Sequence, residues 1–145
     1  MTARIRDATP ADADDVARLM RLVGTAIAPG DSRAATGMED FLARGGLVLL
    51  AEEDERVLGA CALLIGRLNP MDETPAAWLD GIAVDEGSRR RGIGSALMRE
   101  AHRRATAAGC DSIVLHTHED ELPAMALYGR LGLARHGVLF LWDLR

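Results

Sequence analysis

The stretch from Trp78 to Thr117 constrains the fold more than any other part of the sequence. Trp78 to Val84 and Ser112 to Thr117 are each interpreted as a strand. Between them lies a long segment with one apolar face at helical spacing, which stops at Gly109 and carries Ile93, Leu97, Ala101, Ala105 and Ala108. A strand, a helix and a strand in this order form a crossover with parallel strands. The pattern therefore predicts a mixed α/β fold built around this crossover.

Helices and antiparallel strands are predicted before the crossover. A short strand over 3–7 precedes a helix, because Thr9 can cap it, Pro10 suits its first position and apolar residues recur up to Ile27. A weaker helix is expected over 32–43, followed by an antiparallel hairpin of the runs 47–51 and 57–65 around a charged turn. After the crossover we expect a short helix over 122–131 and a final strand over 138–144.

Composition excludes several classes of protein. The 145 residues fit one domain, and no apolar run is long enough to cross a membrane. The net charge of −5 argues against a dedicated nucleic-acid binder, and all 17 basic residues are arginines. A chain without lysine cannot form a P-loop or a Schiff base. With two cysteines and no apolar leader in its first ten residues, the chain is expected in the cytoplasm.

The segment from Arg89 to Ser95 is suited to binding phosphate. Gly92 and Gly94 open the long helix just after three arginines, so free amides and the helix dipole can meet an anion closely. The alternative is a helix start with a solvated basic turn. A dinucleotide-binding fingerprint fails, because Leu97 holds the place of its third glycine.

Two motifs resemble the GNAT superfamily of N-acetyltransferases. Arg89-Arg-Arg-Gly-Ile-Gly94 is similar to the family's R/Q-x-x-G-x-G/A pattern, and Pro123 to Leu133 is similar to its P-A-x-x-L-Y-x-x-L-G-F segment. The resemblance covers essentially the whole chain and implies a single N-acetyltransferase domain over residues 1–145. It also implies a central, mixed but mostly antiparallel sheet of about six to seven strands, with a splayed parallel pair at its centre and about four flanking helices.

The resemblance also implies acetyl-CoA as cosubstrate, with no metal. It places the pyrophosphate on the turn that opens the long helix and the pantetheine arm beside the strand that precedes it. The cofactor-binding residues that it implies are Ile82, Ala83, Val84, Arg89, Arg90, Arg91, Gly92, Ile93, Gly94, Ser95 and Leu127.

Tyr128 and Asp80 are the catalytic candidates. Tyr128, the chain's one tyrosine, occupies the family's general-acid position, where a phenol can protonate the leaving thiolate. Its alternative role is core packing. Asp80 stands where many family members carry a strand carboxylate, which can deprotonate the amine through water or hold an ammonium. A strand-edge aspartate that bonds backbone is an equal alternative.

For the other polar residues near these motifs the sequence leaves a functional and a structural role open. The acidic run Glu119 to Glu121 is either a solvated surface or part of the mouth of the cleft. His116 and His118 are expected on one side of their strand, as a proton relay or as half of a metal site that lacks further ligands. Cys110 is interpreted as structural.

The sequence departs from the family pattern in three places. Arg90 replaces a frequent glycine, Glu121 replaces a frequent asparagine, and the 13 residues after Gly132 are few for two closing strands. A tight hairpin or a rudimentary strand is therefore expected at that end.

The predicted activity is direct attack by a primary amine on acetyl-CoA within a ternary complex. The acceptor is expected to be a small molecule or a peptide N-terminus, cationic because the chain is acidic. The alternative is a non-catalytic acyl-CoA-binding sensor or interaction module of the same fold; a nucleic-acid-directed enzyme is disfavoured by the charge. No membrane or nucleic-acid partner is expected, and a homodimer is left open.

Overall fold

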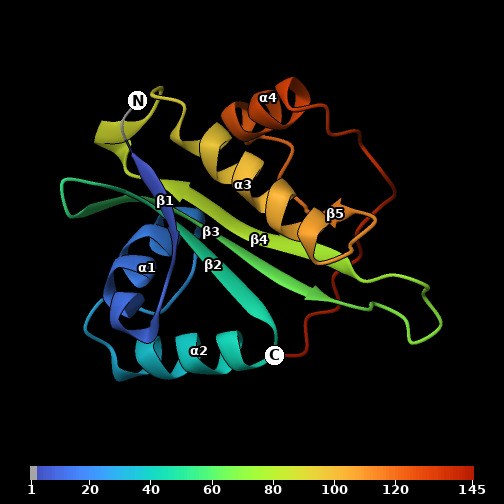
Figure 1. The fold of residues 1–145 in the computed structure, drawn as a ribbon, viewed down its shortest axis with the longest axis horizontal. Coiled ribbons are helices and arrows are strands. Elements are labelled where there is room, and N and C mark those ends of the chain that lie inside the picture. Colours follow the sequence, from blue (N-terminus) through green and yellow to red (C-terminus); the bar gives the residue numbers. More distant parts are fainter. Residues whose placement is uncertain (1–2) are drawn as a thin grey trace. The chain divides into compact units, whose positions relative to one another are not determined.

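The computed structural model describes residues 3–145 and divides the chain into two compact units, one ending at Leu115 and one comprising His116–Arg145. The first unit contains one sheet of five strands in the order β1-β2-β3-β4-β5 (Figure 1). The first three pairings are antiparallel and that of β4 with β5 is parallel. The strands are β1 (Arg4–Asp7), β2 (Gly46–Glu53), β3 (Arg56–Gly66), β4 (Ala76–Val84) and β5 (Ile113–Val114).

The predicted mixed, mostly antiparallel sheet is confirmed, with fewer strands than expected. The sheet has five strands instead of six or seven, so the parallel pair β4–β5 lies at its edge and not at its centre. A single domain over residues 1–145 stays a prediction. No helix among residues 3–145 has the length and apolar character that a membrane crossing requires.

Helices cover both faces of the sheet in the first unit. One face carries η1 (Pro10–Asp12), α1 (Ala13–Met20), η2 (Arg21–Val23) and α2 (Ser32–Ala43), and α3 (Ile93–Ala107) lies on the other (Figure 1). The first helix is shorter than predicted, because Gly24 takes a left-handed conformation (φ 93°) that closes its last turn. The predicted limits of α2 are confirmed.

The alternation of side chains in β2 and β3 builds a core on each face. Val48, Leu50 and Ala60 belong to the buried cluster with α1 and α2. Gly59 faces α3, since a Cβ there would lie 3.0 Å from Ile93 Cγ2 and 3.1 Å from Leu97 Cδ1. The missing side chain thus lets α3 pack closely on the sheet, which fixes where this helix begins relative to β4.

Two strand predictions near the C-terminus are wrong. β5 comprises Ile113–Val114 instead of 112–117, and 138–144 forms no strand. In the second unit α4 (Leu122–Arg130) is formed as expected, and no backbone–backbone hydrogen bond joins 138–144 to a described residue. A strand requires a paired neighbour, and this apolar run has none within the described chain.

Candidate active site

The turn between β4 and α3 has the backbone conformation of an anion-binding loop. After β4 the chain passes through η3 (Glu86–Ser88), then Arg90 (φ 64°) and Gly92 (φ 78°), and α3 begins at Ile93. A Cβ at Gly92 would meet no atom within 4 Å. Gly92 is therefore required by its backbone conformation and not by lack of space.

The backbone amides of this turn are free to donate a hydrogen bond to a ligand. The first hydrogen bond of α3 runs from the Ala96 amide to the Gly92 carbonyl, at 3.0 Å. The amides of residues 90–95 donate to no acceptor within the described chain. Together with the positive end of the helix dipole, they form a surface able to accept a phosphate group.

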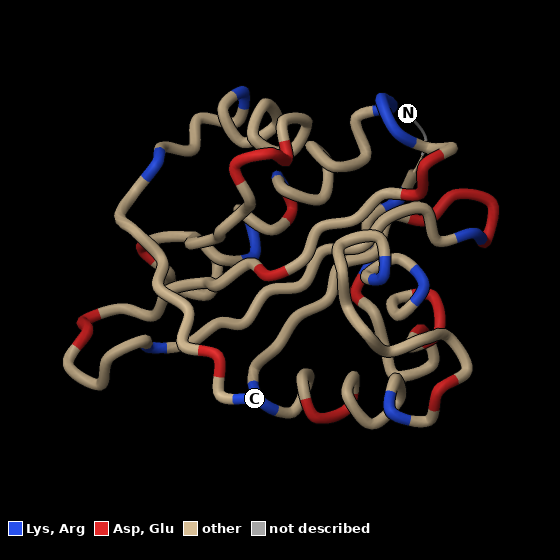
Figure 2. The backbone as a smooth tube through the Cα atoms, turned by 180° about the vertical axis from the view of Figure 1, so that it is seen from behind, with Lys and Arg blue, Asp and Glu red and all other residues tan. Residues whose placement is uncertain are grey.

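The three arginines of the turn have different surroundings. Arg89 Nε lies 3.3 Å from the Val84 carbonyl oxygen, which it donates to across the turn. Arg91 Nη2 lies 2.6 Å from Glu53 Oε2, in the tip of the β2–β3 hairpin. Figure 2 shows this acidic hairpin tip beside the basic turn. Arg90 is exposed and has no side-chain partner among the described residues, so it is the arginine available to a ligand.

A β-bulge interrupts β4 at Asp80, the strand carboxylate predicted as a catalytic residue. Cys61 pairs with Ile82 and Leu63 with Leu79, so Asp80 and Gly81 together lie opposite the single residue between the two β3 positions. Gly81 has φ 92°, and a Cβ there would lie 2.8 Å from Met20 Sδ at the end of α1. The bulge therefore depends on glycine for its backbone conformation, whereas a Cβ there would require only a shift of the Met20 side chain. Asp80 is exposed, and its carboxylate has no partner within residues 3–145.

The last part of β4 has one open side. Within residues 3–145, β4 pairs with β5 only at Ala77 and Trp78, so residues 79–84 have no strand neighbour there on the β5 side of the sheet. Ile82, Ala83 and Val84 lie in this stretch, directly before the turn with the free amides. An extended ligand that pairs with backbone would find unpaired strand groups here.

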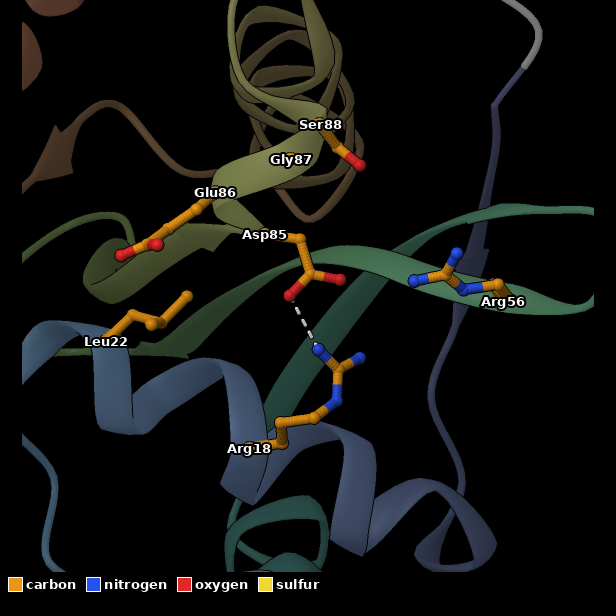
Figure 3. Close-up of a pocket in the computed structure, with 7 residues that line it drawn as sticks. All are labelled: Arg18, Leu22, Arg56, Asp85, Glu86, Gly87 and Ser88. Atoms are coloured by element: carbon orange, nitrogen blue, oxygen red, sulfur yellow. Dashed lines mark hydrogen bonds and ion pairs between the residues drawn. The ribbon is translucent and has the colours of Figure 1, made fainter.

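A cavity of about 440 Å³ lies beside the start of the turn (Figure 3). Arg18 Nη1 lies 2.6 Å from Asp85 Oδ1, and its Nη2 donates to the Val57 carbonyl at 2.8 Å. This guanidinium thus ties α1 to the ends of β3 and β4. The cavity is lined by Arg18, Leu22, Arg56, Asp85, Glu86, Gly87 and Ser88.

Long-range contacts of the turn were not predicted from the sequence. The pairs Arg18–Asp85 and Arg91–Glu53 join residues 67 and 38 positions apart. Charged residues of both signs are spread along the chain, so no local pattern marks these partners. The one sequence feature that bears on these contacts is the predicted hairpin, because its acidic tip is expected at one end of the sheet.

The remaining candidates lie in the second unit. Leu127 and Tyr128 are half-buried on α4, where the Leu133 amide donates to the Tyr128 carbonyl at 3.0 Å. Their place beside β4 stays a prediction. Glu119 to Glu121 are exposed. His116 and His118 do not share a strand face, because β5 ends at Val114 and the chain beyond it is irregular.

Neither cysteine has the surroundings of a nucleophile. Burial raises the pKa of the Cys61 thiol to about 12. Desolvation, with a smaller contribution from the Asp111 carboxylate, also raises the pKa of Cys110. Both thiols are therefore protonated at neutral pH. Within residues 3–145 no three His, Cys, Asp or Glu side chains gather as metal ligands would.

Known proteins resemble this chain in sequence and in fold. Residues 19–133 match the model of the acetyltransferase (GNAT) family. Human N-acetyltransferase 8 is 34% identical over 100 residues, which are 67% of this chain and 42% of that protein. The chain thus spans less than half the length of this relative.

Solved structures share the fold. The ribosomal-protein-alanine N-acetyltransferase of Brucella melitensis biovar Abortus 2308 is 21% identical with a TM-score of 0.83, over 99% of this chain and 100% of that one. AAC(6′)-Iy, in complex with the bisubstrate analogue CoA-S-monomethyl-acetylneamine, is 20% identical with a TM-score of 0.84, over 100% of this chain and 99% of that one.

Proposed function

The chain belongs to the acetyltransferase (GNAT) family, and on this premise we propose that it is an N-acetyltransferase that moves the acetyl group of acetyl-CoA to a primary amine. The acceptor is a small molecule or a peptide N-terminus. One observation carries the proposal: the uncommitted amides of residues 90–95 lie at the start of α3, directly after a part of β4 with an open side. This arrangement suits a ligand with an anionic group at one end of an extended, amide-containing arm.

The pyrophosphate and the pantetheine arm of acetyl-CoA each have a complementary feature in the chain. The amides of the turn and the free guanidinium of Arg90 would hold the pyrophosphate. The unpaired backbone of Ile82 to Val84 would bond the pantetheine amides as a neighbouring strand does. Arg89 and Arg91 contribute indirectly, since their side chains already bond Val84 and Glu53 and so shape the turn. Leu127 supplies an apolar contact from α4.

The chemistry needs an amine without its proton and a thiolate that gains one. The amine nitrogen attacks the thioester carbonyl within a ternary complex; the new C–N bond forms and the C–S bond breaks. Asp80 holds the incoming ammonium or takes its proton through water, and Tyr128 gives a proton to the departing sulfur. The exposed position of Asp80 beside the bulge leaves its carboxylate accessible to an acceptor.

A cationic acceptor fits the charge of the chain. The net charge is −5, and Asp80 in the first unit and Glu119 to Glu121 in the second are exposed carboxylates. AAC(6′)-Iy binds an analogue that joins CoA to acetylneamine, which supports an amine acceptor on this fold. We expect the protein to act as one domain over residues 1–145 in the cytoplasm, where thiols such as Cys61 and Cys110 stay reduced.

The proposal is tested by measuring binding and turnover separately. Calorimetry with acetyl-CoA measures cofactor binding, and thiol release with a panel of polyamines, aminoglycosides and peptides measures transfer, with the product mass identifying the acceptor. Binding together with an acetylated product supports the enzyme. Binding without turnover on any amine supports the acyl-CoA-sensor alternative, and absence of binding contradicts both.

A further inference from the structure

The cavity beside the start of the turn has no part in the proposed acetyl transfer. All the residues that line it belong to the unit that ends at Leu115, and its volume of about 440 Å³ lies in the range of small-molecule sites. Asp80 stands five positions before Asp85, which is roughly 15 Å along an extended strand. The cavity is therefore separate from the carboxylate proposed to meet the amine.

The charges that line this cavity cancel. Two arginines and two carboxylates face it, namely Arg18, Arg56, Asp85 and Glu86. Arg18 Nη1 lies 2.6 Å from Asp85 Oδ1, so these two groups already neutralise each other. Arg56 and Glu86 are exposed, and neither side chain has a partner within residues 3–145. The cavity thus keeps one cation and one anion available, which suits a ligand that carries both charges.

The two available charges lie apart, with an apolar side chain near one of them. In Figure 3, Arg56 lies on one side of the Arg18–Asp85 ion pair. Glu86 lies on the other side together with Leu22, which is 43% exposed. A ligand that reaches both charges has a carboxylate at one end, an ammonium at the other and an apolar portion near the ammonium.

We propose that this cavity binds a small zwitterion, such as a free amino acid, which acts as an effector of acetyl-CoA binding and not as the acetyl acceptor. The Arg56 guanidinium donates hydrogen bonds to the carboxylate of the zwitterion, and the Glu86 carboxylate accepts hydrogen bonds from its ammonium. The apolar portion of the zwitterion lies on Leu22.

Occupancy of the cavity is coupled to the cofactor turn through η3. Glu86 belongs to η3 and Arg56 to β3, so a ligand that bonds both ties the start of the turn to the sheet. A turn held in position before the cofactor arrives loses less conformational freedom when it binds phosphate. The coupling is reciprocal, so acetyl-CoA raises the affinity for the zwitterion by the same factor. This coupling rests on the proposed function, whereas binding of the zwitterion does not.

The first test is calorimetry of zwitterion binding to the full chain without cofactor. The probes are leucine, β-alanine and ε-aminocaproate, with caproate and butylamine as singly charged controls. At least one zwitterion is expected to bind with a Kd of about 1 mM or lower, and both controls about tenfold more weakly. Absence of binding by all three zwitterions, or equal binding of a singly charged control, would overturn the proposal.

Four variants test the two contacts. Arg56→Gln and Glu86→Gln each remove one charged partner, and each is expected to weaken zwitterion binding about tenfold. Arg21→Gln and Glu39→Gln remove exposed charges of the same signs outside the cavity and should leave binding unchanged. Because all four side chains are exposed, circular dichroism and the melting temperature should match those of the native chain. Native zwitterion affinity in Arg56→Gln or Glu86→Gln would refute the site.

The second test is titration of acetyl-CoA with and without a saturating amount of the zwitterion that binds best. The zwitterion is expected to raise acetyl-CoA affinity about fivefold in the native chain and in Arg21→Gln. Arg56→Gln should show native affinity for acetyl-CoA alone and no such rise. An unchanged affinity in the native chain, or acetylation of the zwitterion itself, would overturn the effector role. Zwitterion binding without acetyl-CoA binding would contradict the proposed function and with it the coupling, while the cavity site itself would stand.

Discussion

Arg91 Nη2 lies 2.6 Å from Glu53 Oε2, so the turn before α3 is tied to the tip of the β2–β3 hairpin. The Arg91 side chain is 38% exposed and that of Glu53 22%, so solvent screens the pair and its direct effect on stability is below about 1 kcal/mol. With Arg18 bonding Asp85 at the other end, the turn is held on both sides. The pair therefore matters for the position of the turn more than for the stability of the fold.

Glu53→Gln is expected to weaken acetyl-CoA binding by about two- to fivefold. Without the ion pair the turn is less well held in its binding conformation, which costs up to about 1 kcal/mol of binding free energy. The melting temperature should change little. Calorimetry of the variant beside Glu55→Gln, an exposed residue of the same hairpin tip, provides the comparison. Equal affinity in the two variants would show that the pair does not position the turn.

Gly92→Ala is expected to destabilise the chain by about 1 to 2 kcal/mol, because alanine is strained at φ 78°. Acetyl-CoA affinity should fall as well, since the turn must change shape to relieve the strain. Gly87→Ala is the matched control, because a Cβ at Gly87 also meets no atom within 4 Å and its φ is not in the left-handed range. Urea unfolding and calorimetry check both effects, and identical behaviour of the two variants would contradict the assignment.

Tyr128→Phe is expected to keep acetyl-CoA binding and lower kcat by about 10²- to 10⁴-fold, because only the proton-donating hydroxyl is removed. Steady-state kinetics on the identified acceptor give kcat, and calorimetry gives the cofactor affinity. A reduction below about threefold would mean that Tyr128 packs or orients and does not donate a proton.

Asp80→Asn separates two roles of the carboxylate. Loss of a proton path would lower kcat and change its rise with pH, since a free alkylamine with a pKa near ~10 must be deprotonated before attack. Loss of an ammonium contact would mainly raise KM. Glu73→Gln, an exposed carboxylate in the β3–β4 loop, is the control. If kcat, KM and the pH profile all stay unchanged, Asp80 is structural and Glu119 and Asp120 are tested next.

Stability is expected to fall in acid through the contacts of Arg6. Hydrogen bonds from Arg6 hold the pKa of Asp12 and that of Glu52 below their ordinary values. Both groups stabilise the fold above the pKa of the unfolded chain, near ~4, and lose this contribution as pH falls through the folded pKa. Arg6→Gln should lower stability at pH 7 and flatten its acid dependence in urea unfolding. Arg44→Gln, at an exposed ion pair with Asp40, should leave the pH dependence unchanged.

The sequence predicted those elements whose conformation is set by residues close together in the chain. The hairpin of β2 and β3 follows from two apolar runs around a charged turn, and α2 begins where the Asp31 carboxylate accepts a hydrogen bond from the Arg33 amide, at 2.9 Å. The helix start at Gly92 was also predicted, because glycine allows the left-handed conformation there. These features depend on neighbours along the chain.

Features with distant causes were missed. The run 138–144 is as apolar as β3, yet it forms no strand, because a strand depends on a partner that its own sequence does not specify. The bulge at Asp80 and Gly81 was hidden for a similar reason, since it is defined by its register against β3 and by the approach of Met20. The ion pairs that hold the turn join residues far apart in the chain and left no local signal.

The bulge in β4 makes the length of this strand as important as its composition. The bulge places two residues of β4 opposite one residue of β3, so deleting Gly81 would leave a regular ladder in which Ile82 still pairs with Cys61 and Ala83 with Ala60. Ala83 would therefore keep its place in the core with α1 and α2. The deletion would instead remove the local bend of β4 and so change the direction in which the chain enters the turn. Relatives that keep this turn are thus expected to conserve the number of residues in β4 even where they change the residues themselves.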